Sequence, residues 1–326
     1  MKRILIALAV LLAVQVADAQ VKSPAAAAKA VTSAEAASKD AKKAAKVATW
    51  VKLAQSYMDA YNAPVGNAWI GATAQELSLL MGSEKPVSET QVELNGTPYL
   101  KVSYSNKDFY YGQDLKLAMI IVTQPVVEDA LAKSFEAWKK AYEVDAKQSK
   151  VKDINAGLAS IAQKYVGDAY NAYQFGDLAK ASKLFAAAAE VSATAPYSNL
   201  DKDALYNAGF TAWMAKDYAG AQKYFEECVA NEYYYDDGEV FAKLADIHKN
   251  LGNGEKVVAI LEEGFSKFPQ SQSILIGLIN YYLENKQDPA RLFELIDLAK
   301  QNEPNNASLY YVEGNIYKEL GKNEEA

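Results

Sequence analysis

Apolar residues recur at helical spacing through the C-terminal half of the chain, and the pattern repeats with a fixed period. The corresponding place in four successive segments is held by Leu205, Phe241, Ile276 and Tyr310. These positions are 36, 35 and 34 residues apart. Each segment has two apolar stripes separated by a turn, so each is predicted to form a pair of helices. A period of this length is typical of a solenoid, in which each pair stacks on its neighbours.

Small residues and turn residues occupy matching places within the segments. The positions where the paired helices are expected to cross hold Ala169, Gly209, Ala245 and Gly314. Asn280 replaces the small residue in one segment, which predicts a looser helix contact there. An upstream copy, residues 164–191, has Gly176 at its turn. Small crossing residues let helix backbones approach closely, so the pattern predicts tightly packed pairs.

These segments resemble the tetratricopeptide repeat family, whose unit reads W-x2-L-G-x2-Y, then A-x3-F, then P. The stretches with this pattern are 205–229, 241–269 and 274–304, and Pro269 and Pro304 end two of them. The resemblance implies an all-α superhelical solenoid, and the N-terminal features described below lead us to expect an exported bacterial repeat protein. It also implies a concave groove, built mainly from the first helix of each pair, that binds a protein or peptide partner.

The first repeat is predicted to be interrupted. Residues 47–60 read as a first helix, whereas a matching second helix is found only at about 126–145. We therefore expect residues 47–146 to form one repeat split by a β-rich insert over 62–125. Residues 150–326 are expected to form the remaining array, which ends in an incomplete repeat.

The insert has the alternation of strands. Two extended runs flank Asn95-Gly96, a favoured pair for a tight hairpin turn, and Leu100, Val102 and Tyr104 alternate on one face. Two further short strands are predicted around Gly112, with a short helix before the sheet at 68–81. The sequence thus predicts three or four antiparallel strands.

The N-terminus has the features of an export signal. A basic pair precedes the apolar run Ile4–Ala17, and Ala17-Asp18-Ala19 is a small-x-small cleavage site, which predicts a signal peptide over 1–19. The run is too short to span a bilayer, and no similar apolar stretch follows, so no transmembrane segment is expected in the mature chain. The first mature residue is not Cys, which argues against a lipoprotein. We expect export to the periplasm or secretion.

Charge is distributed unevenly along the mature chain. Residues 20–60 contain seven Lys and three acidic residues, a net charge of +4, which leaves −12 for residues 61–326. An acidic body argues against a nucleic-acid partner, which would need a basic face. Residues 20–46 are rich in Ala and Lys and are expected to form a solvated N-terminal helix or a frayed arm, with a simple N-terminal cap as the alternative.

The sequence offers no catalytic chemistry. Cys228 is the only cysteine, which excludes an internal disulfide, and the only histidine, His248, falls on an apolar helix stripe; both are expected in the core. Adjacent acids such as Glu226 and Glu227 point apart on a helix and do not form an acid–base pair. Motifs for nucleophiles, phosphates and dinucleotides are missing. We therefore predict no catalytic residue, no metal site and no cofactor.

Aromatic residues are the candidate binding residues. The positions that match the groove of the family include Tyr170, Tyr173, Tyr206, Phe210, Trp213, Tyr281 and Tyr311. Exposed rings dominate binding surfaces, although some of these rings could instead belong to the core. In the family, Lys, Arg and Asn side chains of the groove bind the C-terminal carboxylate of a peptide. The matching positions here are Asp203, Asn207, Glu239 and Ala242, so this carboxylate site is not expected.

Two functions remain open at this point. The first is a non-enzymatic scaffold that binds a protein or peptide in the groove, and the second is an accessory protein that binds cell-wall glycan or peptidoglycan, because aromatic platforms also stack on sugars. The Tyr-rich stretch 231–240 is either a contact patch or a packing corner between repeats.

Overall fold

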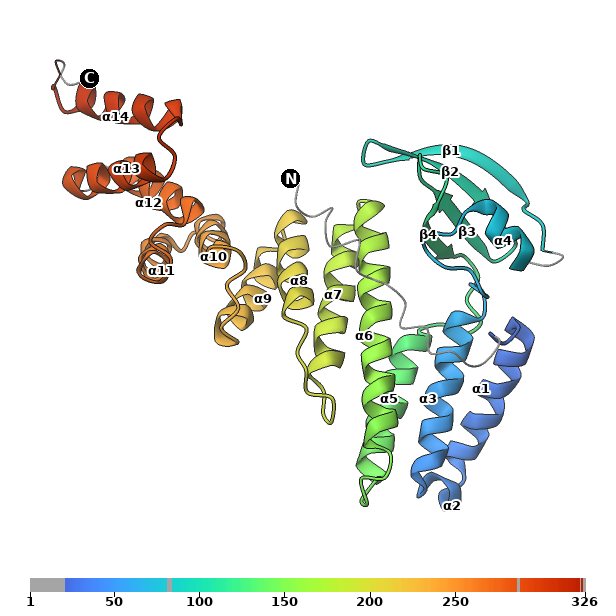
Figure 1. The fold of residues 1–326 in the computed structure, drawn as a ribbon. Helices are drawn as coiled ribbons and strands as arrows, with labels where there is room; N and C mark the ends of the chain where they lie inside the picture. The colour runs from blue at the N-terminus through green and yellow to red at the C-terminus, as the bar shows by residue number, and fades with distance from the viewer. Residues whose placement is uncertain (1–20, 81–83, 286–287, 323, 325–326) are drawn as a thin grey trace. The chain divides into compact units, whose positions relative to one another are not determined.

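The computed structural model describes residues 21–80, 84–285, 288–322 and 324, so the predicted signal peptide lies outside the described residues. Figure 1 shows many helices and one small sheet. The chain divides into two compact units. The first contains the described residues up to Glu93 together with Thr97–Ala137, and the second contains Leu94–Gly96 and the chain from Trp138 onwards.

The first unit combines helices with the sheet. Its helices are α1 (Pro24–Lys39), α2 (Ala41–Ala44), α3 (Val47–Asn62) and α4 (Ala74–Leu80). Its strands are β1 (Ser88–Leu94), β2 (Thr97–Ser103), β3 (Lys107–Tyr111) and β4 (Leu117–Val122). Helix α5 (Ala130–Val144) contributes its residues up to Ala137 to this unit and the rest to the second.

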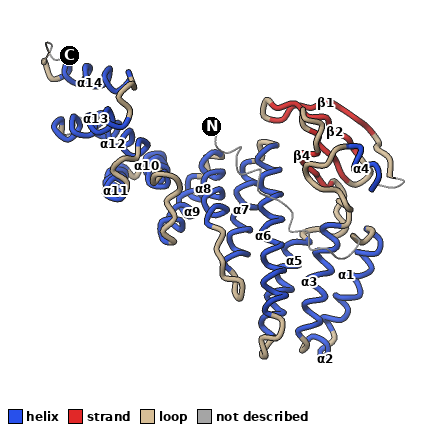
Figure 2. Tube along the Cα trace, viewed as in Figure 1, coloured by secondary structure: helices blue, strands red, loops and turns tan. Residues whose placement is uncertain are grey.

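The second unit is a series of helices joined by short turns. They are α6 (Val151–Gln174), α7 (Leu178–Ala193), α8 (Lys202–Met214), α9 (Tyr218–Ala230), α10 (Glu239–Asn250), α11 (Gly254–Lys267), α12 (Gln272–Asn285), α13 (Pro289–Asn302) and α14 (Ala307–Glu319). From α6 to α14, each helix packs against the next. Contacts between sequence neighbours are typical of a solenoid, and Figure 2 shows the succession of helices. The predicted fold class, a helical solenoid of tetratricopeptide-like repeats with a small antiparallel β insertion, is confirmed.

The insert forms the sheet that its alternation predicts. The four strands lie in the order β1-β2-β3-β4, and β2 and β4 both pair antiparallel with β3. Asn95 and Gly96 have φ values of 48° and 75° at the β1–β2 turn, as a tight hairpin requires. Val102 lies in the core of the insert with Phe109 and with Leu77 of α4. The packing of α4 on one sheet face closes this small core.

The hairpin tip, Leu94–Gly96, belongs to the second unit and makes hydrogen bonds within it. The Asn95 side-chain amide donates to the backbone carbonyls of Tyr173 and Gln174, at 3.2 and 2.9 Å, near the end of α6. The left-handed backbone at Asn95 thus serves both the turn and these bonds.

The Ala-rich segment near the N-terminus is a packed helix. Ser23 caps α1, and Pro24 occupies its first turn. One stripe of α1, formed by Ala27, Val31 and Ala34, is buried, and α1 packs against α3. Small side chains are sufficient to pack α1 against α3 because they let the two helix backbones approach closely. Of the alternatives for residues 20–46, the structure has a helix covering α3.

A hydrogen bond joins α3 and α5, the two helices predicted to form the interrupted repeat. The hydroxyl of Ser134 on α5 donates to the backbone carbonyl of Ala54 on α3 at 2.8 Å, and both residues lie in the first unit. Helices that are 80 positions apart in the sequence therefore touch. The boundaries 47–146 for a single split repeat remain a prediction that this contact supports.

The period of the buried positions differs from the predicted one. Ile276 is 42% exposed, whereas Leu275 is fully buried; likewise Tyr310 is exposed and Leu309 is buried. The core positions 205, 241, 275 and 309 are therefore separated by 36, 34 and 34 residues. A shift of one residue turns a helix by about 100°. Because of this shift, the Asn280 side chain is exposed and its neighbour Ile279 is buried. The prediction that Asn280 lies at the helix crossing was therefore wrong.

Two glycines of α6, one in close contact with another helix and one beside open space, allow a matched test of how tightly α6 packs against α5. A Cβ at Gly157 would overlap the indole of buried Trp138, whereas a Cβ at Gly167 would meet nothing within 4 Å. We expect Gly157→Ala to lower the free energy of unfolding by about 1–3 kcal/mol through overpacking. Gly167→Ala should raise it by about 0.4–1 kcal/mol through helix propensity. Urea unfolding followed by circular dichroism measures both, and equal effects would contradict the packing described.

Candidate functional site

The groove residues predicted from the sequence differ widely in exposure. Tyr206 is only 4% exposed and belongs to the core, whereas Tyr311 is 72% exposed on α14. The others are partly buried: Tyr170, Tyr173, Phe210, Trp213 and Tyr281. Their role in partner binding remains a prediction, but Tyr206 contributes to it only by supporting its neighbours.

A row of aromatic rings runs along α8, with Tyr235 from the loop before α10 at one end. Tyr235 stacks on Tyr206 with ring centroids 3.8 Å apart, and Phe210 follows at 6.1 Å from Tyr206. Trp213 continues the row at 5.8 Å from Phe210. Burial is the main cause that raises the pKa of the Tyr206 phenol far above its usual range. The row is therefore an uncharged, rigid support beneath this surface.

Charged side chains of α10 cover the end of the row. The indole N–H of Trp213 donates to the carboxylate of Asp246 at 2.6 Å. The ammonium of Lys243 lies 3.9 Å from the centroid of the Trp213 ring, within the range of a cation–π interaction. Lys243 also pairs with Glu239 one turn earlier, at 3.3 Å. The ring thus fixes α8 against α10 and positions three charges at the surface.

The Tyr-rich stretch 231–240 packs between repeats. Tyr234 stacks on Phe241 at 5.5 Å and also contacts Phe268, while Tyr233 donates a hydrogen bond to Asp203. Tyr235 covers Tyr206 as described above. All three Tyr side chains are engaged within the protein, so of the two alternatives the structure supports the packing corner.

A cavity of about 200 Å³ lies between α10 and α12. Its apolar lining comprises Ala242, Ala245, Val257, Leu261, Ile276 and Gly277. Its polar lining comprises Asp246, Lys249, Ser273, Asn280, Tyr281 and Glu284. The sequence pattern did not predict this cavity. The small residues Ala242 and Gly277 could have indicated it, because small side chains leave space between helices. That Gly277 faces this cavity follows only from the one-residue shift in the buried positions of α12.

The polar rim of the cavity is only loosely held. Lys249 and Glu284 form an ion pair at 2.7 Å, but both side chains are more than half exposed. Exposed pairs of this kind contribute about 0–1 kcal/mol, so a ligand can displace them at little cost. The floor is firmer, because a Cβ at Gly277 would lie 2.8 Å from the Leu261 side chain. The cavity therefore combines a fixed apolar floor with an adaptable polar edge.

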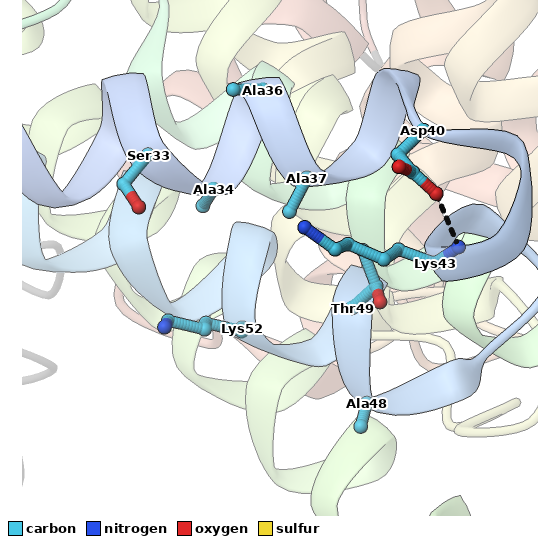
Figure 3. Close-up of a pocket in the computed structure, with 9 residues that line it drawn as sticks. All are labelled: Ser33, Ala34, Ala36, Ala37, Asp40, Lys43, Ala48, Thr49 and Lys52. Atoms are coloured by element: carbon cyan, nitrogen blue, oxygen red, sulfur yellow. Dashed lines mark hydrogen bonds between the residues drawn. The ribbon is translucent and has the colours of Figure 1, made fainter.

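A second cavity, of about 560 Å³, lies between α1 and α3 in the first unit. Its lining consists of Ser33, Ala34, Ala36, Ala37, Asp40, Lys43, Ala48, Thr49 and Lys52, all of which Figure 3 shows. In that view the Lys43 side chain runs along the cavity beneath Ala37. We call this cavity the α1–α3 groove.

The single cysteine and the single histidine are buried in the array. Cys228 is fully buried, and burial raises the pKa of its thiol to about 12. His248 is also buried, beside Asn253 at 3.4 Å, so the prediction that both lie in the core is confirmed. In the part of the chain that the structure describes, no cluster of metal-ligating residues is present. No helix among the described residues is long and apolar enough to cross a bilayer.

Comparison with known proteins finds likeness only among solved structures, since no protein-family model and no curated protein matches the chain. YrrB, described as a TPR protein with an unusual peptide-binding site, is 17% identical and covers 59% of this chain and 87% of its own, with a TM-score of 0.38. Pseudomonas aeruginosa pilF is 16% identical and covers 60% and 79%, also with a TM-score of 0.38. MamA of AMB-1 is 15% identical and covers 51% and 85%, with a TM-score of 0.40. At these scores the likeness assigns neither a family nor a function.

The burial of the only histidine predicts a pH effect on stability. Burial is the main cause that lowers the pKa of His248 from 6.5 in the folded protein, and Lys256 adds to it. As the pH falls through 6.5, the unfolded chain binds a proton before the folded one does. The free energy of unfolding should therefore decrease below about pH 6.5, and His248 should have no effect above it.

Because the chain has one histidine, a single imidazole resonance can be titrated by NMR. Urea unfolding of the protein and of His248→Gln at about pH 7.5 and about pH 5.5 gives the second readout. Between these two pH values, the free energy of unfolding should decrease less for His248→Gln than for the wild type. A resonance that titrates above 6.5 would contradict the burial argument.

Proposed function

We propose that this protein is an exported, non-enzymatic scaffold that binds a protein or peptide partner on the surface formed by α8, α10 and α12. The single observation that supports this most is the cavity between α10 and α12, with its apolar floor and polar rim. Binding pockets for peptides commonly combine an apolar site for one anchoring side chain with polar groups that fix its orientation.

The chemistry of the rim suits an extended peptide. The side-chain amide of Asn280 is exposed and can both donate to and accept from a peptide backbone. The apolar floor beside it, with Ala242 and Gly277, leaves room for one apolar side chain. Lys249 and Glu284 can exchange their mutual ion pair for charges of the partner. The surface is thus suited to a peptide with an apolar anchor flanked by polar residues.

The rings of α8 support this surface and do not form a free platform. One face of Tyr206 is covered by Tyr235, and the Trp213 ring is covered by Lys243. A sugar would stack on an open ring face, whereas a peptide can use the ring edges and the charges above them. These contacts favour the peptide-binding proposal over the alternative of glycan or peptidoglycan binding.

The proposal of a non-enzymatic role rests on the placement of reactive groups. A general base or a nucleophile must reach substrate, and the buried Cys228 and His248 line neither cavity. The polar residues around the α10–α12 cavity are Lys, Asp, Glu, Asn, Ser and Tyr side chains suited to recognition. We propose no catalytic residue and no cofactor.

Export and removal of the signal peptide can be tested directly. We propose that the mature chain begins at Gln20, because the small residues Ala17 and Ala19 stand at the positions that a signal peptidase reads. The mass of the protein recovered from the periplasm or the culture medium should match residues from Gln20 onwards. Ala19→Arg should leave the signal attached. An intact Met1 terminus on exported wild-type protein would refute the cleavage site.

Filling the cavity tests the binding surface. Peptides selected from a random phage library on the mature protein should bind it, and Ala242→Phe should weaken their binding by roughly ten-fold or more, because the new ring occupies the cavity. Ala219→Phe, on an exposed position of α9, adds the same volume outside the cavity and is the matched control. If both variants bind the peptides like the wild type, the partner does not use this cavity.

A further inference from the structure

The α1–α3 groove has a floor of small side chains. Ala34 is buried at the bottom, and Ala37 and Ala48 line it from the two helices that form its sides. Ser33 and Thr49 add short hydroxyl side chains. Small residues along a groove between two helices allow a third helix to approach closely, since no long side chain holds its backbone away. The groove is therefore shaped to accept a helix.

Two ammonium groups border this groove. Lys43 and Lys52 are exposed, and Figure 3 shows both side chains beside the Ala-lined floor. Among the described residues, neither of them has an ion-pair partner. The nearby carboxylate of Asp40 accepts hydrogen bonds from the backbone N–H groups of Lys42 and Lys43, at 3.0 Å each, and so caps α2. The positive charges at the groove are thus left for an external partner.

The charge of the surrounding segment strengthens this preference. Residues 20–60 have a net charge of +4, although the rest of the mature chain is acidic. Three further lysines, Lys39, Lys42 and Lys46, are exposed near the α1–α3 turn. Complementary charge speeds association and selects among partners. A helix with acidic residues along its edges matches both the shape and the charge of the groove.

We propose that the α1–α3 groove is a second docking site, independent of the α10–α12 cavity, and that its occupant is an acidic, Ala-rich helix of a partner protein. The helix packs its small residues on Ala37 and Ala48. Its carboxylates pair with Lys43 and Lys52. This is the helix-in-groove mode of recognition, with small residues in place of large apolar anchors.

A designed peptide tests the proposal on the mature full-length chain. The probe is a synthetic Ala-rich helix of about 18 residues, about 27 Å long, with Glu along both edges of its Ala face. The matched peptide has Gln in place of each Glu. We expect the Glu peptide to bind at least about ten-fold more tightly than the Gln peptide in calorimetric titrations at low salt.

Variants of the chain separate charge from shape. The double variant Lys43→Glu and Lys52→Glu should weaken the binding of the Glu peptide by about ten-fold or more. The variant Ala48→Phe should also weaken it by filling the groove. The double variant Lys147→Glu and Lys152→Glu makes the same charge change at exposed residues outside the groove and should leave binding unchanged. Circular dichroism confirms that each variant is folded.

Three results would overturn the proposal. They are absence of binding by the Glu peptide, equal loss in the Lys147 and Lys152 control, and equal binding by unstructured polyglutamate. Binding to vesicles that contain phosphatidylglycerol tests whether the groove instead recognises an anionic lipid surface. If they bind in a way that depends on Lys43 and Lys52 while the Glu peptide does not, the groove recognises an anionic lipid surface and not a helix.

Discussion

The helical array depends on one steric constraint: large rings pack where a neighbouring helix has no Cβ. Gly209 on α8 faces the Phe225 ring, which would lie 3.0 Å from an added Cβ, and a Cβ added at Gly264 on α11 would lie 2.7 Å from the Cβ of Phe241. In a densely packed interior an extra methyl group at such a contact forces side chains or backbone to shift, typically at a cost of about 1–3 kcal/mol. Because each helix pair sets the position of the next, a small local shift would be passed along the array.

The same constraint explains the chemistry of the α8–α10–α12 surface. Close helix packing brings Asp246 and Lys243 of α10 over the ring of Trp213 on α8, so that the ring is partnered before any ligand arrives. The surface that remains is a small apolar floor, at Ala242 and Gly277, with polar groups at its edge. A preorganised surface loses little conformational entropy on binding. The rings of α8 therefore contribute to the proposed binding surface mainly through the shape and rigidity they give it.

Much of the fold could be predicted from periodicity and turn chemistry, but burial could not. The Asn95-Gly96 pair predicted the hairpin because its left-handed backbone is a local property, and the helix pairs followed from their apolar stripes. The exposure of Ile276 depended on the length of a turn between helices, where an error of one residue changes the face of a whole helix. The burial of Tyr206 did not follow from the sequence for a similar reason, since Tyr235, which covers it, lies in an irregular loop. Sequence spacing identifies elements, whereas contacts across elements decide which side chains remain available.

The two cavities differ in the physical term that would dominate binding, and this makes them independent. In the α10–α12 cavity the gain comes from burying an apolar side chain, a short-range term that salt hardly weakens. In the α1–α3 groove the gain comes largely from exposed ammonium groups, whose attraction is screened over about 8–10 Å at physiological salt. A partner selected by one cavity has little reason to fit the other, because an acidic Ala-rich helix offers no large apolar anchor. Under the two proposals, raising the ionic strength should therefore release an acidic helix from the α1–α3 groove while a peptide in the α10–α12 cavity stays bound.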